Sequence, residues 1–215
     1  YSRTRQYIQL ASNSQGGTPM DFWFPSNPNV KPQIADQYAV GYFRNFLNDI
    51  VETSVEVYYK DMQNQIDFKD HAILIMNPQI DGELRVGHAR SYGIELFVRK
   101  QSGRFTGWVS YTLSKSEKQI DGINDGAYYP TNFDKPHNIS LVAMYDFTKR
   151  LSLSTSWVYY TGAPVTFPTG KYEYGNKMIP VYSGRNGSRL PDYHRLDISV
   201  TLKGKDKPGK KYKGE

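Results

Sequence analysis

Apolar and polar residues alternate with a period of two along most of the chain. The clearest alternation lies between Ile50 and Lys60. One side of this segment carries Val51, Thr53, Val55, Val57 and Tyr59, and the other carries Glu52, Ser54, Glu56, Tyr58 and Lys60. Successive side chains of a β-strand point to opposite faces, so the pattern predicts a strand with one apolar and one polar face.

Segments of this kind recur from end to end, and helical spacing fits none of them well, so the chain is predicted to be all-β. The expected strands are Tyr1–Ser12, Ile34–Asn45, Ile50–Lys60, Val86–Lys100, Phe105–Leu113, Asn138–Phe147, Leu151–Tyr160 and Tyr193–Lys203.

The connectors between these segments alternate between short and long. The short ones are Phe46–Asp49, Gln101–Arg104 and Thr148–Arg150, and the long ones are Asn13–Gln33, Asp61–Arg85, Lys118–His137 and Thr161–Asp192. Long loops without structure of their own are uncommon in compact domains, whereas outer-membrane barrels join strands by tight periplasmic turns and long extracellular loops. We therefore predict an antiparallel up-and-down transmembrane β-barrel segment of about eight strands.

Such a barrel should carry an aromatic belt at each membrane interface. Phe46, Phe105 and Phe147 flank the short turns, and Tyr38, Trp157, Tyr159 and Tyr160 lie farther along their strands. Trp108 falls among hydroxyl-bearing neighbours and fits neither belt.

Composition agrees with strands rather than helices. Aromatic residues make up 14% of the chain while the mean hydropathy is only −0.65. No run approaches the roughly 18 apolar residues of a spanning helix, so any membrane crossing must be made by strands. Cysteine is absent and the net charge is +6. The basic cluster Lys203–Lys213 alternates with Gly, Pro and Asp like a solvated turn, so no nucleic-acid partner is expected.

Residues with catalytic or metal-binding chemistry do not form a recognisable pattern. The four histidines are dispersed, and neither a G-x-S-x-G motif nor a glycine-rich phosphate loop occurs, so no catalytic residue, cofactor or enzyme activity is expected. The loop Asp121–Gly126 offers oxygen ligands that suit calcium, but it fails the EF-hand pattern at the third position and lacks the bidentate Glu. No metal site is therefore predicted.

Aromatic residues also occur in the long connectors, at Phe22–Pro25, Tyr128–Pro130 and Tyr172–Tyr174. Such rings could stack on a ligand or pack loop on loop, and packing is the preferred interpretation. The candidate ligand-contacting residues are Trp23, Tyr128, Tyr129 and Tyr172. Pro136 lies at the end of a long loop just before a strand, where its missing N–H does no harm, and Asp134 and His137 could form hydrogen bonds that tie this loop to the rim. Glu95, Arg195 and Asp197 should lie on the lumen side of their strands.

Five segments resemble a known family. They are Ala89–Leu96 (ARSYGIEL), Gly107–Lys115 (GWVSYTLSK), Phe133–Ser140 (FDKPHNIS), Gly162–Pro168 (GAPVTFP) and Arg189–Asp197 (RLPDYHRLD). Their order and spacing, within Ile34–Leu202, are similar to barrel strands of TonB-dependent receptors of the Bacteroidetes type.

The resemblance implies an outer-membrane barrel of about 22 strands with an N-terminal plug. The resemblance implies that this chain is about eight strands of that larger barrel, with residues 1–215 forming one partial barrel domain: its C-terminal portion, without the plug and the last strands. The implied partners are outer-membrane lipid, the TonB–ExbB–ExbD system acting through the plug, the remaining strands and, in some relatives, a surface lipoprotein. The implied function is active uptake of a siderophore, vitamin, glycan or peptide.

A soluble β-sandwich or lipocalin-like ligand-binding domain is the alternative. The two hypotheses differ in where the apolar side chains point. A barrel wall turns them toward lipid, whereas a sandwich buries them in a dry centre.

Overall fold

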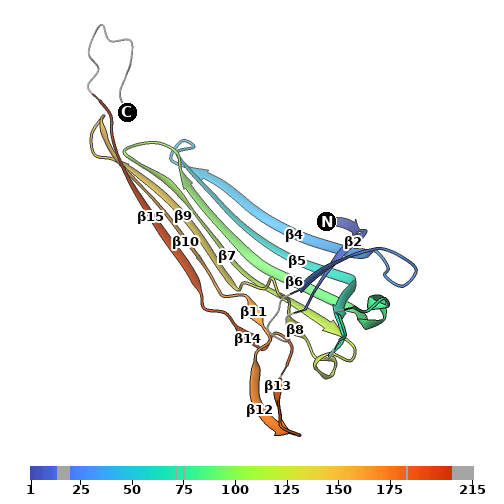
Figure 1. Cartoon of the computed structure of the whole chain (residues 1–215). Coiled ribbons are helices and arrows are strands. Elements are labelled where there is room, and N and C mark those ends of the chain that lie inside the picture. The colour runs from blue at the N-terminus through green and yellow to red at the C-terminus, as the bar shows by residue number, and fades with distance from the viewer. Residues whose placement is uncertain (14–19, 71, 75, 183, 205–215) are drawn as a thin grey trace.

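The computed structural model of the chain describes residues 1–13, 20–70, 72–74, 76–182 and 184–204. Its main element is one large, curved antiparallel sheet (Figure 1). The strands of this sheet are β1 (Ser2–Gln6), β4 (Gln33–Phe46), β5 (Val51–Phe68), β6 (Leu84–Lys100), β7 (Phe105–Ile120), β8 (Tyr129–Pro130), β9 (His137–Asp146), β10 (Leu151–Tyr160) and β15 (Tyr193–Leu202). They pair in the order β1–β4–β5–β6–β7–β9–β10–β15, and β8 pairs with β7.

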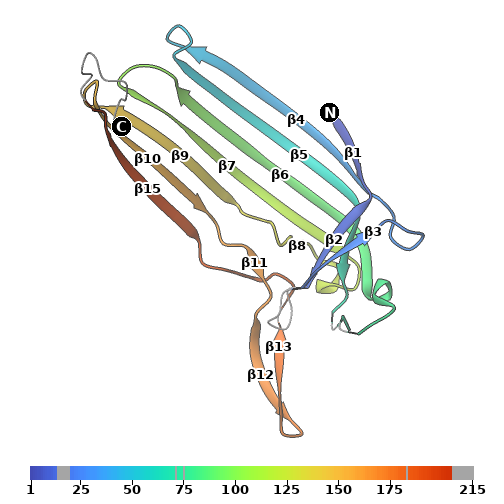
Figure 2. The ribbon, with the colours of Figure 1, turned by 45° about the horizontal axis from the view of Figure 1, so that its top comes forward.

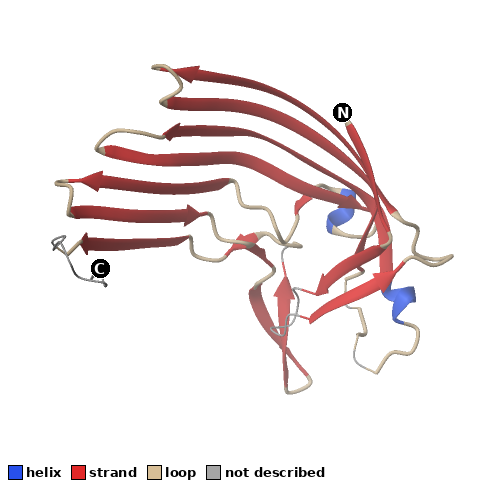
Figure 3. Cartoon of the chain, turned by 90° about the horizontal axis from the view of Figure 1, so that it is seen from above, coloured by secondary structure: helices blue, strands red, loops and turns tan. Residues whose placement is uncertain are grey.

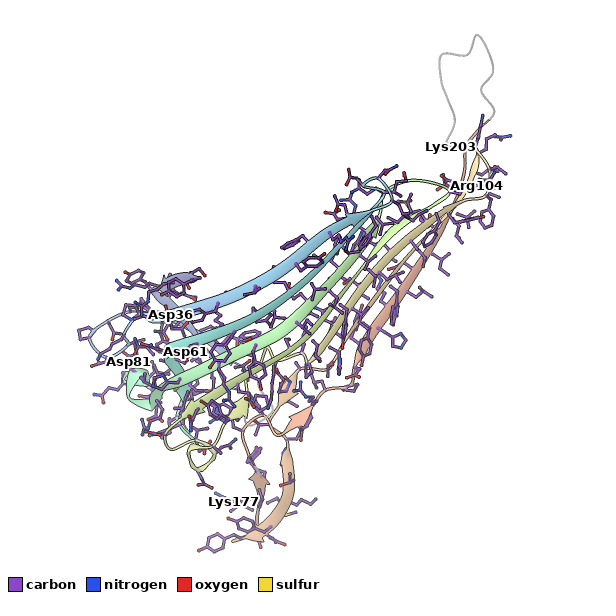
Figure 4. All side chains as sticks on the ribbon, turned by 180° about the vertical axis from the view of Figure 1, so that it is seen from behind. Asp36, Asp61, Asp81, Arg104, Lys177 and Lys203 are labelled. Carbon is purple, nitrogen blue, oxygen red and sulfur yellow. The ribbon has the colours of Figure 1, made fainter. Side chains whose placement is uncertain are left out.

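The connections alternate in length as predicted. Residues 47–50, 101–104 and 147–150 make short turns at one end of the sheet, and the longer connections lie at the other end (Figure 2). Figure 4 places Arg104 and Lys203 at the short-turn end, and Asp36, Asp61 and Asp81 at the opposite end. The chain therefore runs up and down between a tight rim and a loose rim, which we call the short-turn rim and the loop rim.

Strand register gives the sheet two chemically different faces. We define the apolar face by the cross-strand rows Tyr38–Tyr59–Tyr92, Val40–Val57–Ile94–Leu113 and Tyr42–Val55–Leu96–Tyr111. The polar face is defined by the rows Ser54–Phe97–Ser110–Ser140 and Glu56–Glu95–Thr112–Asn138. The period-two alternation in the sequence is thus carried across the whole sheet.

The apolar face is exposed. Val40 is 79% exposed, Val57 53% and Ile198 65%. In the described part of the chain, no second sheet covers these side chains, so the dry centre of a sandwich is not observed. Eight residue steps from Phe46 to Tyr38 span about 27 Å along the strand, close to the roughly 25 Å apolar band of outer-membrane barrels. The fold-class prediction is confirmed, although the sheet does not close into a barrel within the described residues.

Aromatic residues border the apolar face at both ends. Phe105, Tyr145 and Phe147 lie at the short-turn rim, with the Tyr145 and Phe147 rings 4.9 Å apart. Toward the loop rim, Tyr59 stacks on Tyr92 at 6.4 Å. These positions match the expected belts.

Of the aromatic residues singled out in the sequence, Tyr160 and Trp108 lie on the polar face instead. Tyr160 was expected in a belt, but its register places it beside Tyr193, on which it stacks at 4.8 Å. Trp108 also lies on the polar face, with its ring 6.2 Å from that of Phe97. Each ring therefore packs against a polar-face neighbour.

The ends of the expected strands differ from those observed. The strand expected at Ile50–Lys60 continues to Phe68, past an irregularity between Met62 and Gln65 where Asn64 has a φ of 57°. The single strand expected at Tyr1–Ser12 is divided, because pairing with β4 stops at Gln6 and β2 (Ile8–Asn13) pairs with β3 (Met20–Pro25) instead. Exchange of pairing partner, which periodicity cannot reveal, causes this break.

The long connections also carry more structure than expected. A hairpin of β12 (Pro168–Tyr174) and β13 (Lys177–Tyr182) projects from the loop rim, with Lys177 near its tip (Figure 4). The same connection, between β10 and β15, also contains the pair β11 (Pro164–Val165) and β14 (Ser188–Arg189). Two other connections contain the short 3-10 helices η1 (Ile80–Glu83) and η2 (Asn124–Gly126), which Figure 3 shows beside the sheet. Among the described residues, no helix is long and apolar enough to cross a membrane. The basic cluster Lys203–Lys213 lies outside the described residues from position 205 onward.

Buried apolar side chains gather near the loop rim. One cluster joins Ile66, Phe68 and Leu84 of the sheet to Ala11 and Phe24 of the β2–β3 hairpin. A second contains Ile120, Ile123 and Tyr129. The hydrophobic interior of the described chain thus holds the connections to the sheet, while the sheet's own apolar face remains open.

A lysine on the apolar face should destabilise the barrel. Val57→Lys near the middle of β5 should cost the complete receptor about 2–4 kcal/mol of folding free energy in a bilayer, because the ammonium would face hydrocarbon. Ser110→Lys on the polar face of β7 is the matched control and should be nearly neutral. Urea-dependent folding into lipid vesicles measures both, and an equal loss in the two variants would contradict the assignment of the faces.

Candidate functional site

The long connections are tied to the sheet by the buried side chain of Arg185. This residue lies between β13 and β14, and its side chain is only 2% exposed. Its Nη1 donates to Asp67 Oδ1 at 3.3 Å, and its Nη2 donates to the Phe68 carbonyl and to Asp70 Oδ1, both at 2.9 Å. Arg185 therefore joins the connection between β10 and β15 to the end of β5.

Asp67 is the centre of this buried cluster. Besides Arg185, its carboxylate accepts a hydrogen bond from the Tyr129 hydroxyl at 2.9 Å and faces Lys118 Nζ at 3.8 Å. Burial, reinforced by the Asp67 carboxylate, raises the pKa of the Tyr129 phenol well above its ordinary value. Tyr129 thus stays protonated and acts as a donor that holds β8 against β5.

The backbone beside Arg185 is fixed by two asparagines. Asn124 Oδ1 accepts from the Arg185 amide at 2.7 Å, and Asn186 Nδ2 donates to the Pro130 carbonyl at 2.8 Å and to Asn132 Oδ1 at 2.6 Å. These contacts join the β10–β15 connection to the β7–β9 connection. Together with the Arg185–Asp70 hydrogen bond in the β5–β6 connection, they join three connections into one structured body, which we call the loop body.

A second tie lies nearer the start of β9. Asp134 is buried, accepts from the Ser116 amide at 2.7 Å and pairs with the guanidinium of Arg189. Arg189 Nη1 also donates to the Gly162 carbonyl at 3.1 Å. The expected tie between Asp134 and the rim is observed, whereas His137 contacts the Tyr111 hydroxyl at 2.9 Å.

Gly162 follows β10 and packs against Leu190, where the same connection returns to β15. A Cβ on Gly162 would lie 1.7 Å from the Leu190 carbonyl oxygen, so only glycine fits there. Asp192 accepts from the Tyr159 hydroxyl at 2.6 Å and from the Gly162 amide at 3.0 Å, and these bonds lower the pKa of its carboxyl below the ordinary range. At the Gly-Ala-Pro segment, the beginning and the end of the β10–β15 connection therefore lie in close contact, and we call this contact the close crossing.

A cavity of about 350 Å³ lies between the sheet and the β2–β3 hairpin. Met62, Gln65, Ser116 and Lys118 line it from the sheet, and Trp23 lines it from β3. Met62, Ser116 and Lys118 all occupy polar-face positions. The cavity is therefore on the side of the sheet that faces away from lipid in a barrel.

The four aromatic ligand candidates do not share one site. Trp23 borders the cavity just described and is 63% exposed. Tyr128 covers the Arg90 guanidinium, 3.9 Å from its ring centre, and Tyr129 is buried in the Asp67 cluster. Tyr172 lines a different cavity of about 480 Å³ at the base of the β12–β13 hairpin, together with Asn124 and Asp125.

Metal-binding chemistry is not concentrated anywhere in the described part of the chain. No group of three or more His, Asp or Glu side chains there could hold an ion. In the loop Asp121–Gly126, the side chain of Asn124 bonds Arg185. The loop thus has a structural contact that its sequence did not indicate.

Sequence reasoning missed Arg185 and Asp67. Arg185 lies in the polar run Ser-Gly-Arg-Asn-Gly-Ser, which is typical of a solvated turn, and Asp67 lies 118 positions earlier in a segment expected to be a loop. Only the three-dimensional pairing of these residues reveals their role.

The fold and the site define the class of protein: a wall of an outer-membrane β-barrel with structured loops at one rim. The family model described as TonB dependent receptor-like, beta-barrel matches residues 1–210, and the chain therefore belongs to the TonB-dependent receptor family. Members of this family are transporters located in the bacterial outer membrane.

A solved structure supports the fold. The chain is similar to the ferripyoverdine receptor of the outer membrane of Pseudomonas aeruginosa, solved with ferripyoverdine bound, at 14% identity and a TM-score of 0.56. The similarity covers 80% of this chain and 21% of that receptor, so the chain spans about a fifth of the receptor's length. No curated protein sequence matches the chain significantly.

Adding one methyl group at the close crossing should disrupt the loop body. Gly162→Ala places a Cβ against the Leu190 carbonyl and should displace the connection, because backbone rather than a flexible side chain blocks it. Gly170→Ala is the matched control, since a Cβ added there meets nothing within 4 Å. Limited proteolysis of the complete receptor should cut within residues 161–192 faster only in Gly162→Ala, and equal cleavage of both variants would contradict the crossing.

Removing the buried guanidinium should loosen the connections together. Arg185→Met leaves Asp67 with only Lys118 and Tyr129 as partners and should reduce the local free energy of unfolding by about 3 kcal/mol. Amide hydrogen exchange in residues 121–134 should therefore become roughly a hundredfold faster. Arg195→Ala, which removes a pair whose side chains are more than half exposed, should change exchange little. Unchanged exchange in Arg185→Met would show that Arg185 does not hold the loops.

Proposed function

We propose that this chain forms part of the barrel wall and of the ligand-facing loops of a receptor that takes up a scarce nutrient across the outer membrane. The TonB–ExbB–ExbD system of the inner membrane supplies the energy, acting through a plug domain. The observation that carries the proposal is a sheet with one face open to lipid, one polar face, and buried ion pairs that hold the loops at a single rim.

The open sheet is consistent with a wall that other strands complete. Strands β1 and β15 are the edges of the described sheet. An unpaired backbone N–H or C=O in hydrocarbon costs several kcal/mol, so in a membrane both edges require partner strands. The plug, the remaining strands and, as in some relatives, a surface lipoprotein are the partners that this proposal assigns to the complete receptor.

The soluble β-sandwich or lipocalin-like alternative is not favoured. Either domain needs its largest apolar surface inside, yet Val40, Val57 and Ile198 are mostly exposed here. In the described chain, buried apolar residues occur instead where the connections meet the sheet.

Nutrient uptake should depend on both the receptor and TonB. Cells that lack the receptor gene and cells that lack TonB should each lose uptake of the same labelled compound, drawn from ferric siderophores, cobalamin, oligosaccharides and peptides. Re-expression of the receptor should restore uptake only when TonB is present. Uptake that persists without TonB, or a receptor deletion that affects none of these classes, would contradict the proposed function.

A further inference from the structure

The cavity beside Trp23 has walls from three parts of the chain. The sheet contributes Gln65, Ser116 and Lys118, β3 contributes Trp23, and the β7–β9 connection contributes Thr131 and Phe133. The segments that form it are held in place by the buried clusters at the loop rim. The cavity is therefore a formed feature of the fold and is large enough, at about 350 Å³, for a ligand of one or two rings.

The charges in its wall are already neutralised. Asp67 and Lys118 are its charged residues among those described. Lys118 Nζ donates to the Ile66 carbonyl at 3.1 Å and faces Asp67 at 3.8 Å, while Asp67 also binds Arg185 and Tyr129. A strongly anionic or cationic ligand would find no unpaired counter-charge in this wall, and desolvating its charge would oppose binding.

Neutral hydrogen-bonding groups, in contrast, remain available. Thr131 is 8% exposed, and its hydroxyl has no hydrogen-bond partner among the described residues. Gln65, also 8% exposed, accepts one long bond of 3.4 Å from Gln33, which leaves its own amide N–H groups for a ligand. Buried polar groups are normally satisfied, so the unpaired Thr131 hydroxyl marks a position where a bound molecule would supply the missing hydrogen bond. The Gln65 amide nitrogen is not itself a buried unpaired atom, but it makes no hydrogen bond within the described chain.

Two aromatic rings stand beside these groups. Trp23 is 63% exposed and Phe133 72%. Exposed rings next to neutral amides and hydroxyls match a molecule that presents C–H faces and hydroxyl groups together. Sugar rings have both, because their axial C–H groups form apolar patches while their hydroxyls donate and accept hydrogen bonds.

We propose that this cavity binds a neutral oligosaccharide, with Trp23 and Phe133 against the sugar faces and Gln65 and Thr131 bonding its hydroxyls. The proposal rests on the uptake function proposed above and specifies its substrate class. A ferric siderophore complex that carries negative charge fits the cavity poorly, because Lys118 is already paired.

The test uses the complete receptor, purified in detergent with its plug. Isothermal titration with malto-, cello-, xylo- and manno-hexaose should give binding to at least one sugar. Trp23→Ala and Gln65→Met should each raise the Kd of that sugar about tenfold or more, because one good polar or aromatic contact contributes about that much to binding. Tyr174→Ala removes an aromatic that is 75% exposed in the β12–β13 hairpin and should leave the Kd unchanged.

Circular dichroism and the heat-dependent gel mobility of each variant establish that it is folded. The proposal is overturned if none of the four sugars binds, if Trp23→Ala binds like the wild type, or if a ferric siderophore binds and Trp23→Ala abolishes that binding. TonB-dependent uptake of a siderophore would leave the proposed function standing and remove only the sugar assignment. Uptake independent of TonB would remove the function itself.

Discussion

The structure depends on the need to pair backbone hydrogen bonds where water is absent. A strand in hydrocarbon must give every N–H and C=O group a partner, and an extended antiparallel sheet does so along its whole length. Once backbone pairing is satisfied between strands, side chains are free to differ on the two faces. The rows Val40–Val57–Ile94–Leu113 and Glu56–Glu95–Thr112–Asn138 show the result, since each crosses four strands without changing character.

The same constraint explains why the buried core lies at one rim. Side chains on the apolar face gain from contact with lipid and need no protein cover. The connections at the loop rim leave the membrane, and their backbone must be satisfied by water or by local structure. They use both hairpin pairing, as in β12–β13, and side-chain contacts such as Arg185 with the Phe68 carbonyl. The buried ion pairs therefore act where the sheet itself gives no support.

The wall was largely predictable from the sequence, and the loop body was not. Alternation such as Val51 to Tyr59 identifies the strands, and the contrast of short and long connectors fixes their direction. The strand ends could not be predicted accurately, because a local pattern carries no information about pairing partners, as the division between β1 and β2 shows. The Asp67–Arg185 pair could not be predicted at all, because its two residues are 118 positions apart and each lies in a polar segment of ordinary composition.

The buried cluster also limits what the loop rim can do as a binding surface. Because Arg185, Tyr129 and Asn186 join the β5–β6, β7–β9 and β10–β15 connections, a ligand that displaced one of these connections would have to break its contacts with the others as well. Large rearrangement of a single loop is therefore unfavourable, and selectivity is better supplied by side chains that already face open space. Trp23 and Phe133 meet that condition, whereas Tyr129, which the sequence suggested equally, contributes by fixing the frame on which the exposed rings stand.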